Sequence, residues 1–222
     1  MGFFMEDKMK KLVLLLALLK KYKIMKFLLG QYYSGYLKDI GWFESFENEK
    51  PVDGENNPLP WVTYPFIEFI KPRLQNVATV FEFGSGNSTL FYSRFVNQLV
   101  AVEHDKQWYE HVKFNMPDNV NIKYEKLEYD GQYCRAAASH NYDLIIIDGR
   151  DRTNCIYQSI NSLTSKGCIV LDDSERDRYQ EAITWLTQER GFKKIDFWGI
   201  SPGLFYLKNT TIFYRNGNVL NI

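Results

Sequence analysis

The segment Val80-Phe81-Glu82-Phe83-Gly84-Ser85-Gly86-Asn87-Ser88 has the pattern of a buried strand that ends in an acidic residue and a glycine-rich turn. A second apolar run, Leu99-Val100-Ala101-Val102, leads into Glu103, which follows Glu82 by 21 residues. A strand, a glycine turn, a helix and a second strand ending in an acid are typical of the unit that binds nucleoside-bearing cofactors. The two runs therefore predict a cofactor site at the carboxyl ends of neighbouring strands.

Two classes of cofactor fit this outline, and the glycines help to distinguish them. A dinucleotide fingerprint would have its third glycine at position 89, where the chain has Thr89, and Glu82 would lie unfavourably close to a pyrophosphate. A dehydrogenase is therefore disfavoured. S-adenosylmethionine has no phosphate and carries a cationic amino group and a sulfonium, so a carboxylate beside the turn favours it. A plain strand-to-helix turn that binds no ligand is the alternative.

On these residues the chain resembles the class I S-adenosylmethionine-dependent methyltransferases, whose first motif is an acid, a hydrophobic residue and then G-x-G-x-G. Ser88 stands in place of the third glycine. The resemblance covers residues 59 to 222. Over these residues the chain is similar to small bacterial methyltransferase-like proteins without an assigned substrate. It implies that Glu103 binds both ribose hydroxyls. The cofactor-binding residues that it implies are Glu82, Gly84, Ser85, Gly86, Asn87, Ser88, Glu103 and His104.

Beyond these runs, strand patterns alternate with helix patterns, which indicates an α/β domain with a doubly wound, mostly parallel sheet. Further strands are expected at 120–125, 143–149, 168–172, 194–198 and 211–215, and helices at 88–96, 106–115, 132–139, 152–165 and 175–189. The last two strands have no helix between them and should pair as an antiparallel hairpin. A seven-stranded, Rossmann-like methyltransferase sheet closed by such a hairpin is what the resemblance implies.

Acidic residues also end the fourth and fifth predicted strands, at Asp148 and at Asp172-Asp173. In a doubly wound sheet these strand ends face the crevice that holds the cofactor. A hydroxyl that accepts a methyl group must lose its proton, so a nearby acid can act as the base. We predict Asp148, Asp173 and Arg150 as catalytic residues, with Arg150 recognising an anionic acceptor. Surface salt bridging is the alternative for Arg150 and Arg152.

The strand ends also resemble those of catechol-type O-methyltransferases, in which an acid after strand four and an Asp-Asn pair after strand five bind magnesium. This resemblance implies a metal site at Asp148, Asp172 and Asp173, with Asp173 where that family has an asparagine. Oxygen ligands favour magnesium, manganese or calcium over zinc. Two alternatives remain: a catalytic role without a metal, and capping of the following helix by Asp173 or Ser174.

The amino-terminal part differs in composition from the rest. We expect residues 1–58 to form a basic, leucine-rich helical extension and linker, and residues 59–222 to form the cofactor-binding domain. Residues 1–29 contain seven lysines and two acids, and their apolar run at 12–19 is shorter than the roughly 20 residues that span a bilayer. A basic helix over residues 8–29 is expected to pack on the domain or on a second copy of the chain. Contact with an anionic membrane surface and an uncleaved signal peptide are the alternatives.

Residues 44–60 are polar and rich in proline, asparagine and glycine, which predicts a loop or linker. A helix should start after Trp61, with Pro65 in its first turn. Trp61 and Tyr64 are then placed to border the active site, or to pack the helix onto the sheet.

The overall composition narrows the classes of function. The formal net charge is zero, which argues against a general nucleic-acid binder. The three cysteines are far apart and form no Cys-x-x-Cys pair, so neither a zinc site nor a disulfide framework is indicated. We therefore expect a reduced, cytoplasmic protein, either free or peripheral to the inner face of the membrane.

These observations predict transfer of a methyl group from S-adenosylmethionine to an oxygen of a small molecule or glycan. A nitrogen acceptor is disfavoured because strand four ends in Ile147-Asp148-Gly149-Arg150 and the Asn/Asp-Pro-Pro-Tyr type of motif is absent. The alternative is an accessory protein that binds the cofactor without turnover, or associates with a membrane, and uses residues 1–58 as its interaction surface.

Overall fold

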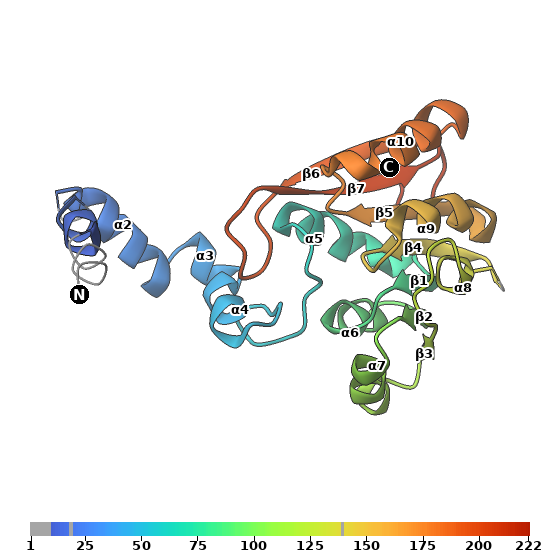
Figure 1. The fold of residues 1–222 in the computed structure, drawn as a ribbon, viewed down its shortest axis with the longest axis horizontal. Coiled ribbons are helices and arrows are strands. Elements are labelled where there is room, and N and C mark those ends of the chain that lie inside the picture. The colour runs from blue at the N-terminus through green and yellow to red at the C-terminus, as the bar shows by residue number, and fades with distance from the viewer. Residues whose placement is uncertain (1–9, 18–19, 139) are drawn as a thin grey trace, which may run out of the picture.

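The computed structural model describes residues 10–17, 20–138 and 140–222. Within these ranges seven strands form a sheet in the order β3-β2-β1-β4-β5-β7-β6 (Figure 1). The strands are β1 (Thr79–Phe83), β2 (Gln98–Glu103), β3 (Val120–Tyr124), β4 (Tyr142–Ile147), β5 (Leu163–Asp172), β6 (Lys193–Gly199) and β7 (Lys208–Tyr214). Strands β1 to β5 are parallel, and β7 is antiparallel to both β5 and β6. The predicted doubly wound sheet with a carboxy-terminal hairpin is confirmed.

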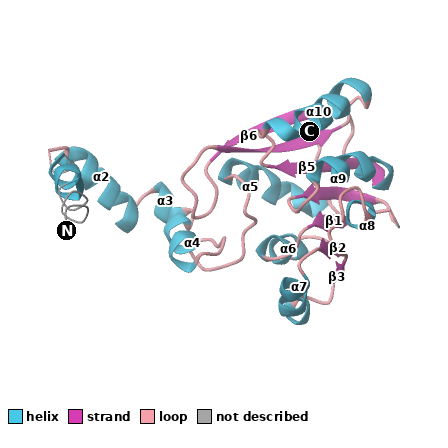
Figure 2. Cartoon of the chain, viewed as in Figure 1, coloured by secondary structure: helices cyan, strands magenta, loops and turns pink. Residues whose placement is uncertain are grey.

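Helices cover both faces of this sheet (Figure 2). They are α5 (Tyr64–Ile70), η1 (Lys71–Asn76), α6 (Asn87–Ser93), α7 (Lys106–Val112), η2 (Lys113–Asn115), α8 (Gln132–Arg135), α9 (Arg152–Ser159), η3 (Ile160–Ser162), η4 (Asp177–Tyr179), α10 (Gln180–Thr184) and η5 (Trp185–Glu189). Each helix expected between strands is present. The segment predicted as a single helix over 175–189 instead begins at Asp177 and changes from 3-10 through α to π geometry.

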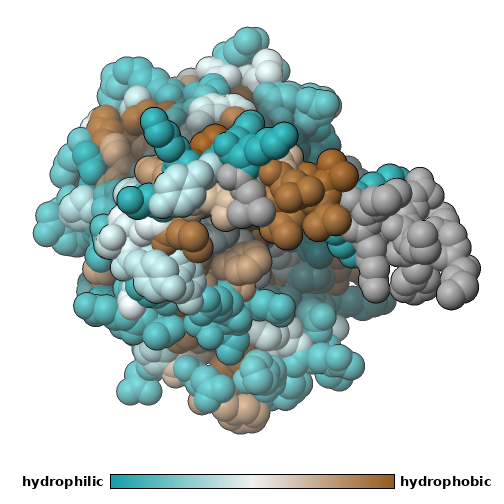
Figure 3. Space-filling view, turned by 90° about the vertical axis from the view of Figure 1, so that its left-hand side faces the viewer, coloured by the Kyte–Doolittle hydropathy of each residue, from teal (hydrophilic) through white to brown (hydrophobic). Residues whose placement is uncertain are grey.

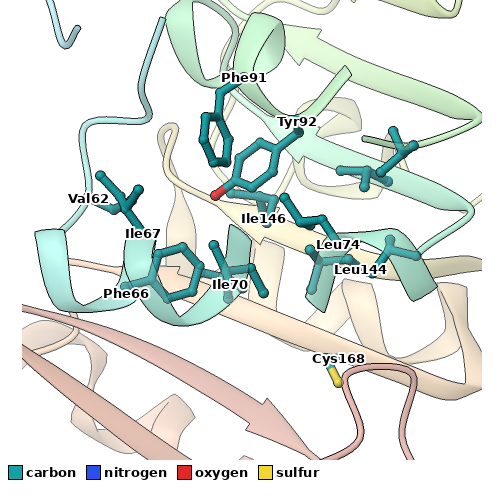
Figure 4. Packing of buried hydrophobic residues seen from close by; sticks show 14 of the residues in the cluster. Val62, Phe66, Ile67, Ile70, Leu74, Phe91, Tyr92, Leu144, Ile146 and Cys168 are labelled. Carbon is teal, nitrogen blue, oxygen red and sulfur yellow. The ribbon is translucent and has the colours of Figure 1, made fainter. Parts of the chain in front are cut away.

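The core consists of two apolar layers, one on each face of the sheet. Successive residues of β4 alternate between them: Leu144 and Ile146 belong to one layer, and Ile145 and Ile147 to the other. Figure 4 shows the first layer, where side chains from α5, η1 and α6 pack above the strands. A strand that is covered on both faces is apolar along its whole length, which explains the uninterrupted run in β4.

The amino-terminal helices form an arm that projects from the domain in Figure 1. We use "arm" for residues 10–17 and 20–39, which comprise a helical segment at 10–17, α2 (Tyr22–Tyr33) and α3 (Tyr36–Asp39). The predicted start of a basic helix at residue 8 lies outside the described residues, and the prediction of one helix as far as residue 29 is wrong, because a turn at Lys20 and Lys21 precedes α2. No residue of α2 is buried. No helix in the described ranges combines the length and apolarity needed to cross a membrane.

After the arm, helix α4 (Trp42–Asn48) packs on the domain. Trp42 Nε1 donates to the carbonyl of Leu204 at 2.9 Å, and the buried Ser45 hydroxyl donates to the carbonyl of Val52 at 2.7 Å. The prediction of a loop from residue 44 is therefore wrong as far as Asn48, because the hydrogen bonds of Trp42 and Ser45 hold α4 in place. The division of the chain at residue 58 stays a prediction.

Candidate cofactor and catalytic site

The turn between β1 and α6 is fixed by a chain of hydrogen bonds. The Gly86 N–H donates to Thr89 Oγ1 at 3.0 Å, and the Thr89 hydroxyl donates to Glu82 Oε2 at 2.6 Å. Thr89 is fully buried. The residue that replaces a dinucleotide-type glycine therefore links the turn to the strand-end carboxylate. Sequence reasoning missed this role, although a hydroxyl residue in the first turn of a helix is a known capping signal.

Glu82 is an acid in a site that disfavours its charge. Only 1% of the residue is exposed, and burial raises its pKa from 4.5 to about 7, although hydrogen bonds from Ser88 and Thr89 oppose the change. A buried carboxylate becomes much easier to ionise when a cation is placed beside it. Glu82 is therefore suited to bind a cationic group in the adjoining pocket.

Glu103 ends β2 and is held in one orientation by three donors. Its Oε1 accepts the backbone N–H groups of His104 at 2.7 Å and Asp105 at 2.8 Å. The Ser85 hydroxyl donates to Oε2 at 3.0 Å, which joins the end of β2 to the glycine turn. An ionised carboxylate only accepts hydrogen bonds, so Glu103 presents its remaining lone pairs to hydroxyl donors such as those of a ribose.

Glu82 and Glu103 line a pocket of about 620 Å³. All eight residues predicted to bind the cofactor lie in its wall: Glu82, Gly84, Ser85, Gly86, Asn87, Ser88, Glu103 and His104. Trp61, Asp148 and Arg150 also contribute, as do residues 49–51 from the segment that follows α4. Trp108 of α7 donates from Nε1 to the carbonyl of Ser85 at 2.9 Å and adds an aromatic wall. Tyr64, by contrast, is buried in the core.

Gly149 allows the ends of β1 and β4 to come close together. A Cβ atom at this position would lie 2.0 Å from Tyr133 Oη and 2.9 Å from the Phe83 carbonyl oxygen, so no other residue fits without movement of the backbone. This approach places Asp148 in the pocket wall, with 21% of its side chain exposed. Burial raises the pKa of Asp148, and Arg152 opposes the shift.

Arg152 is largely buried and connects the ends of β4 and β5. The alternative of a surface salt bridge is therefore wrong for Arg152. Only 10% of its side chain is exposed. Its Nε donates to Gly149 O at 3.0 Å, and one terminal nitrogen donates to the carbonyl and carboxylate of Asp148 at 2.9 and 2.8 Å. The other terminal nitrogen donates to the Asp172 carbonyl and, at 3.4 Å, to Asp173 Oδ2. All five guanidinium N–H groups can thus be used.

Lys208 neutralises the acidic pair that ends β5. Its Nζ lies 2.6 Å from Asp172 Oδ2, 2.8 Å from Asp173 Oδ1 and 3.3 Å from the Trp61 carbonyl oxygen. Burial alone would lower the pKa of Lys208, but the two carboxylates outweigh it and raise that pKa, so the ammonium stays charged. Lys208 and Arg152 also hold the pKa of Asp173 below its ordinary value despite burial. Sequence reasoning gave no indication of Lys208.

The predicted metal site does not fit this arrangement. Asp148, Asp172 and Asp173 do come together at the strand ends, but Lys208 occupies the space between Asp172 and Asp173. In the described part of the chain, no group of three or more His, Cys, Asp or Glu side chains is arranged to hold a metal ion. Of the three acids only Asp148 lines the pocket.

Two other roles were considered for Asp172 and Asp173, namely capping of the following helix and catalysis without a metal. Capping is wrong, because η4 begins only at Asp177 and its start has no side-chain cap. Asp173 is buried and lies outside the pocket wall, so the structure does not bring this predicted catalytic residue to the site. Both acids instead bind the cations that join β5 to β4 and β7.

Comparisons with models of protein families and with curated proteins find no significant match. Solved structures do match. A candidate caffeoyl-CoA O-methyltransferase from Staphylococcus aureus is 17% identical, with a TM-score of 0.57 over 90% of this chain and 100% of the other. A candidate O-methyltransferase from Klebsiella pneumoniae is 17% identical, with a TM-score of 0.55 over 88% and 97%. A methyltransferase from Geobacter sulfurreducens is 13% identical, with a TM-score of 0.52 over 87% and 96%.

These three structures each match 87–90% of this chain and 96–100% of their own length, so the likeness extends over nearly the whole sheet and its helices. The chain therefore has the fold of the class I S-adenosylmethionine-dependent methyltransferases. Fold does not by itself fix activity, so the function has to be argued from the site.

Proposed function

We propose that this protein is an S-adenosylmethionine-dependent methyltransferase that methylates a hydroxyl oxygen of a small molecule or glycan. The observation that carries the proposal is one pocket in which Glu82 and Glu103 flank the glycine turn while Asp148 faces it from β4. Glu82 is placed to bind the cationic part of the cofactor, and Glu103 to accept hydrogen bonds from its ribose. The bound cofactor supplies an activated methyl group.

Asp148 is the group best placed to accept the proton of the acceptor hydroxyl. It lies in the pocket wall, and burial raises its pKa above the ordinary value, which makes the carboxylate a stronger base. Arg152 holds one of its oxygens at 2.8 Å and so fixes the carboxylate in place. The base therefore acts without a metal ion at the acidic pair, which Lys208 already neutralises.

Cations at the rim of the pocket favour an acceptor that carries negative charge. Arg150 is exposed in the pocket wall, and Lys50 lies in the wall formed by residues 49–51. Guanidinium groups recognise carboxylates and phosphates through paired hydrogen bonds. We therefore expect uronic acids or phosphorylated sugars to be better acceptors than their neutral counterparts.

Calorimetric titration with S-adenosylhomocysteine, and in parallel with NADH, tests the cofactor class. Micromolar binding of S-adenosylhomocysteine alone supports the proposal and justifies a screen of acceptors, starting with sugar hydroxyls and catechols, with and without magnesium. Binding of NADH alone would contradict it. Binding of S-adenosylhomocysteine without transfer to any acceptor would favour an accessory protein that holds the cofactor without turnover.

The Glu103→Ala variant should bind S-adenosylhomocysteine more than about tenfold more weakly, because it loses a charge-assisted hydrogen-bond acceptor. The same titration measures this effect. Glu110→Ala, which removes an exposed carboxylate paired with Lys113 on the surface of α7, is the matched control and should leave the affinity unchanged. Equal affinities for the wild type and Glu103→Ala would overturn the assignment of Glu103.

Glu82→Gln should make the fold more stable above pH 7. A carboxyl group whose pKa is higher in the folded state stabilises the fold below pH 4.5, and this contribution is lost as the pH rises through about 7. At about 1.4 kcal/mol for each unit of pKa, ionised Glu82 costs the fold on the order of 3 kcal/mol at pH 8. Glutamine keeps an acceptor for Thr89 but carries no charge.

Urea denaturation at pH 5 and pH 8 measures this difference. Glu82→Gln should gain stability over the wild type at pH 8 and gain much less at pH 5, while its affinity for S-adenosylhomocysteine falls. Glu110→Gln serves as the control at both pH values. A Glu82→Gln variant that is equally stable to the wild type at pH 8 would show that Glu82 carries no charge penalty.

A further inference from the structure

The arm has the composition of a segment that meets an anionic surface. Residues 10–37 contain six lysines and no acidic residue, in a chain whose net charge is zero. The remaining residues of this segment are mostly apolar or aromatic. The lysines at positions 20, 21, 23 and 26 are exposed. Charge of one sign is therefore concentrated on the part of the molecule that extends farthest from the pocket domain (Figure 1).

Apolar side chains of the arm are exposed to a degree that is unusual for a folded domain. Leu12, Val13, Leu14, Leu15 and Leu16 are each 51–63% exposed. The large apolar and aromatic residues of α2 that are 44–78% exposed are Tyr22, Ile24, Phe27, Leu28, Leu29, Tyr32 and Tyr33. Figure 3, which looks toward the arm, shows apolar atoms gathered beside the grey residues. Contiguous exposed apolar surface of this kind marks a protein or membrane contact.

Helix α2 carries its two lysines on one side of an otherwise largely apolar surface. Tyr22, Met25 and Leu29 follow one another at spacings of three and four residues, so they lie on one face of the helix. Lys23 and Lys26 repeat at the same spacing on another face. Lysine stems can cover apolar surface while their charged ends reach the headgroups, and tyrosine is favoured at the boundary between lipid and water. This is the pattern of a helix that lies in the plane of a membrane surface.

We infer that the arm binds the surface of an anionic lipid membrane. The alternative is that this surface contacts a second copy of the chain. Two arms packed symmetrically would bring together the exposed lysines at positions 20, 21, 23 and 26 of both copies, and Asp39 is the one acidic residue in the arm as defined, whereas anionic lipid headgroups supply the opposite charge. Charge complementarity therefore selects the membrane.

The apolar surface continues from the arm onto the domain. Phe46 of α4 is 55% exposed, and Phe205 and Leu207 in the loop between β6 and β7 are 78% and 67% exposed. This loop lies against α4, because Trp42 donates to the Leu204 carbonyl. The segment that would contact lipid therefore ends beside the loop, and the membrane contact extends to the edge of the domain.

Flotation of the full chain with lipid vesicles tests the inference. Vesicles of phosphatidylcholine with 30% phosphatidylglycerol should carry the protein, vesicles of pure phosphatidylcholine should carry at least about tenfold less, and 0.5 M NaCl should release it. Lys23→Glu/Lys26→Glu should reduce the partition coefficient at least about tenfold. The matched control, Lys126→Glu/Lys166→Glu, reverses two exposed charges on the domain and should bind as the wild type does.

Apolar variants separate the membrane from a second copy of the chain. Leu28→Ser/Leu29→Ser should also reduce vesicle binding at least about tenfold, whereas Leu127→Ser/Tyr129→Ser, two exposed residues after β3, should not. Two results would overturn the inference. One is that the protein binds neutral and anionic vesicles equally, or binds neither kind of vesicle. The other is a dimer in sedimentation analysis that Leu28→Ser/Leu29→Ser dissociates. Titration with S-adenosylhomocysteine in the absence of vesicles tests the proposed function separately, so failure here leaves the proposed activity in place.

Discussion

Asp148→Asn is expected to slow methyl transfer by about 10²- to 10⁴-fold, the usual contribution of a general base. The change removes the proton-accepting charge but keeps an oxygen that can accept from Arg152, now 2.8 Å from Asp148 Oδ1. Affinity for S-adenosylhomocysteine should therefore be unchanged. Single-turnover rates with an acceptor found in the screen, together with calorimetry, measure the two effects separately.

The pH profile adds a readout that a purely structural role would not produce. The wild-type rate should fall as the pH drops through the raised pKa of Asp148, because the base must be ionised, and the residual rate of Asp148→Asn should lack that step. Asp177→Asn, an exposed acid at the start of η4, is the matched control. A loss of rate below fivefold, or a parallel loss of cofactor affinity, would remove Asp148 from the role of base.

Lys208→Ala is expected to destabilise the fold by about 3–5 kcal/mol, because it leaves buried carboxylates without their partner. The same change should create a site for divalent cations. Asp172 and Asp173 present oxygens 2.6 and 2.8 Å from the position of the lysine nitrogen, with the Trp61 carbonyl oxygen at 3.3 Å, and such oxygens suit magnesium or manganese. Millimolar MgCl₂ or MnCl₂ should therefore raise the Tm of the variant and leave that of the wild type unchanged.

Thermal unfolding in EDTA and in MgCl₂ tests this prediction. Lys194→Ala removes a lysine that pairs with Asp196 on the surface, and as the matched control it should show no response to the cation. The double variant Lys208→Ala/Asp172→Asn should lose the response. If Lys208→Ala does not fold, Lys208→Gln keeps hydrogen-bond donors at the site. A wild-type protein that magnesium stabilises, with an effect that Asp172→Asn abolishes, would restore the metal site.

The sequence was sufficient to predict the sheet and the residues that line the candidate pocket, because both depend on local patterns. Strand β1, its glycine turn and the acid after β2 are adjacent in sequence, and parallel strands carry their carboxyl ends to one edge. Every residue predicted around the turn, from Glu82 to Ser88, lines the pocket. The hairpin β6–β7 followed from the absence of a helix between two strands.

The charge balance at the end of β5 could not be predicted, because its cations come from distant parts of the chain. Lys208 is 36 residues after Asp172 and reaches it only because β7 pairs with β5. Arg152 is adjacent to the acids in space but not in sequence, and its burial depends on the close approach at Gly149.

The segment between the arm and the domain also forms part of the candidate pocket. Its residues 49–51 line the pocket, and the Asn87 side chain in the glycine turn donates to the Pro51 carbonyl at 2.8 Å. A contact at the arm that moves this segment must therefore change affinity in the pocket, and filling the pocket must change the affinity of the arm by the same factor, since coupling free energies are reciprocal. If the arm binds a membrane as inferred above, membrane attachment and occupancy of the pocket would then be coupled equilibria.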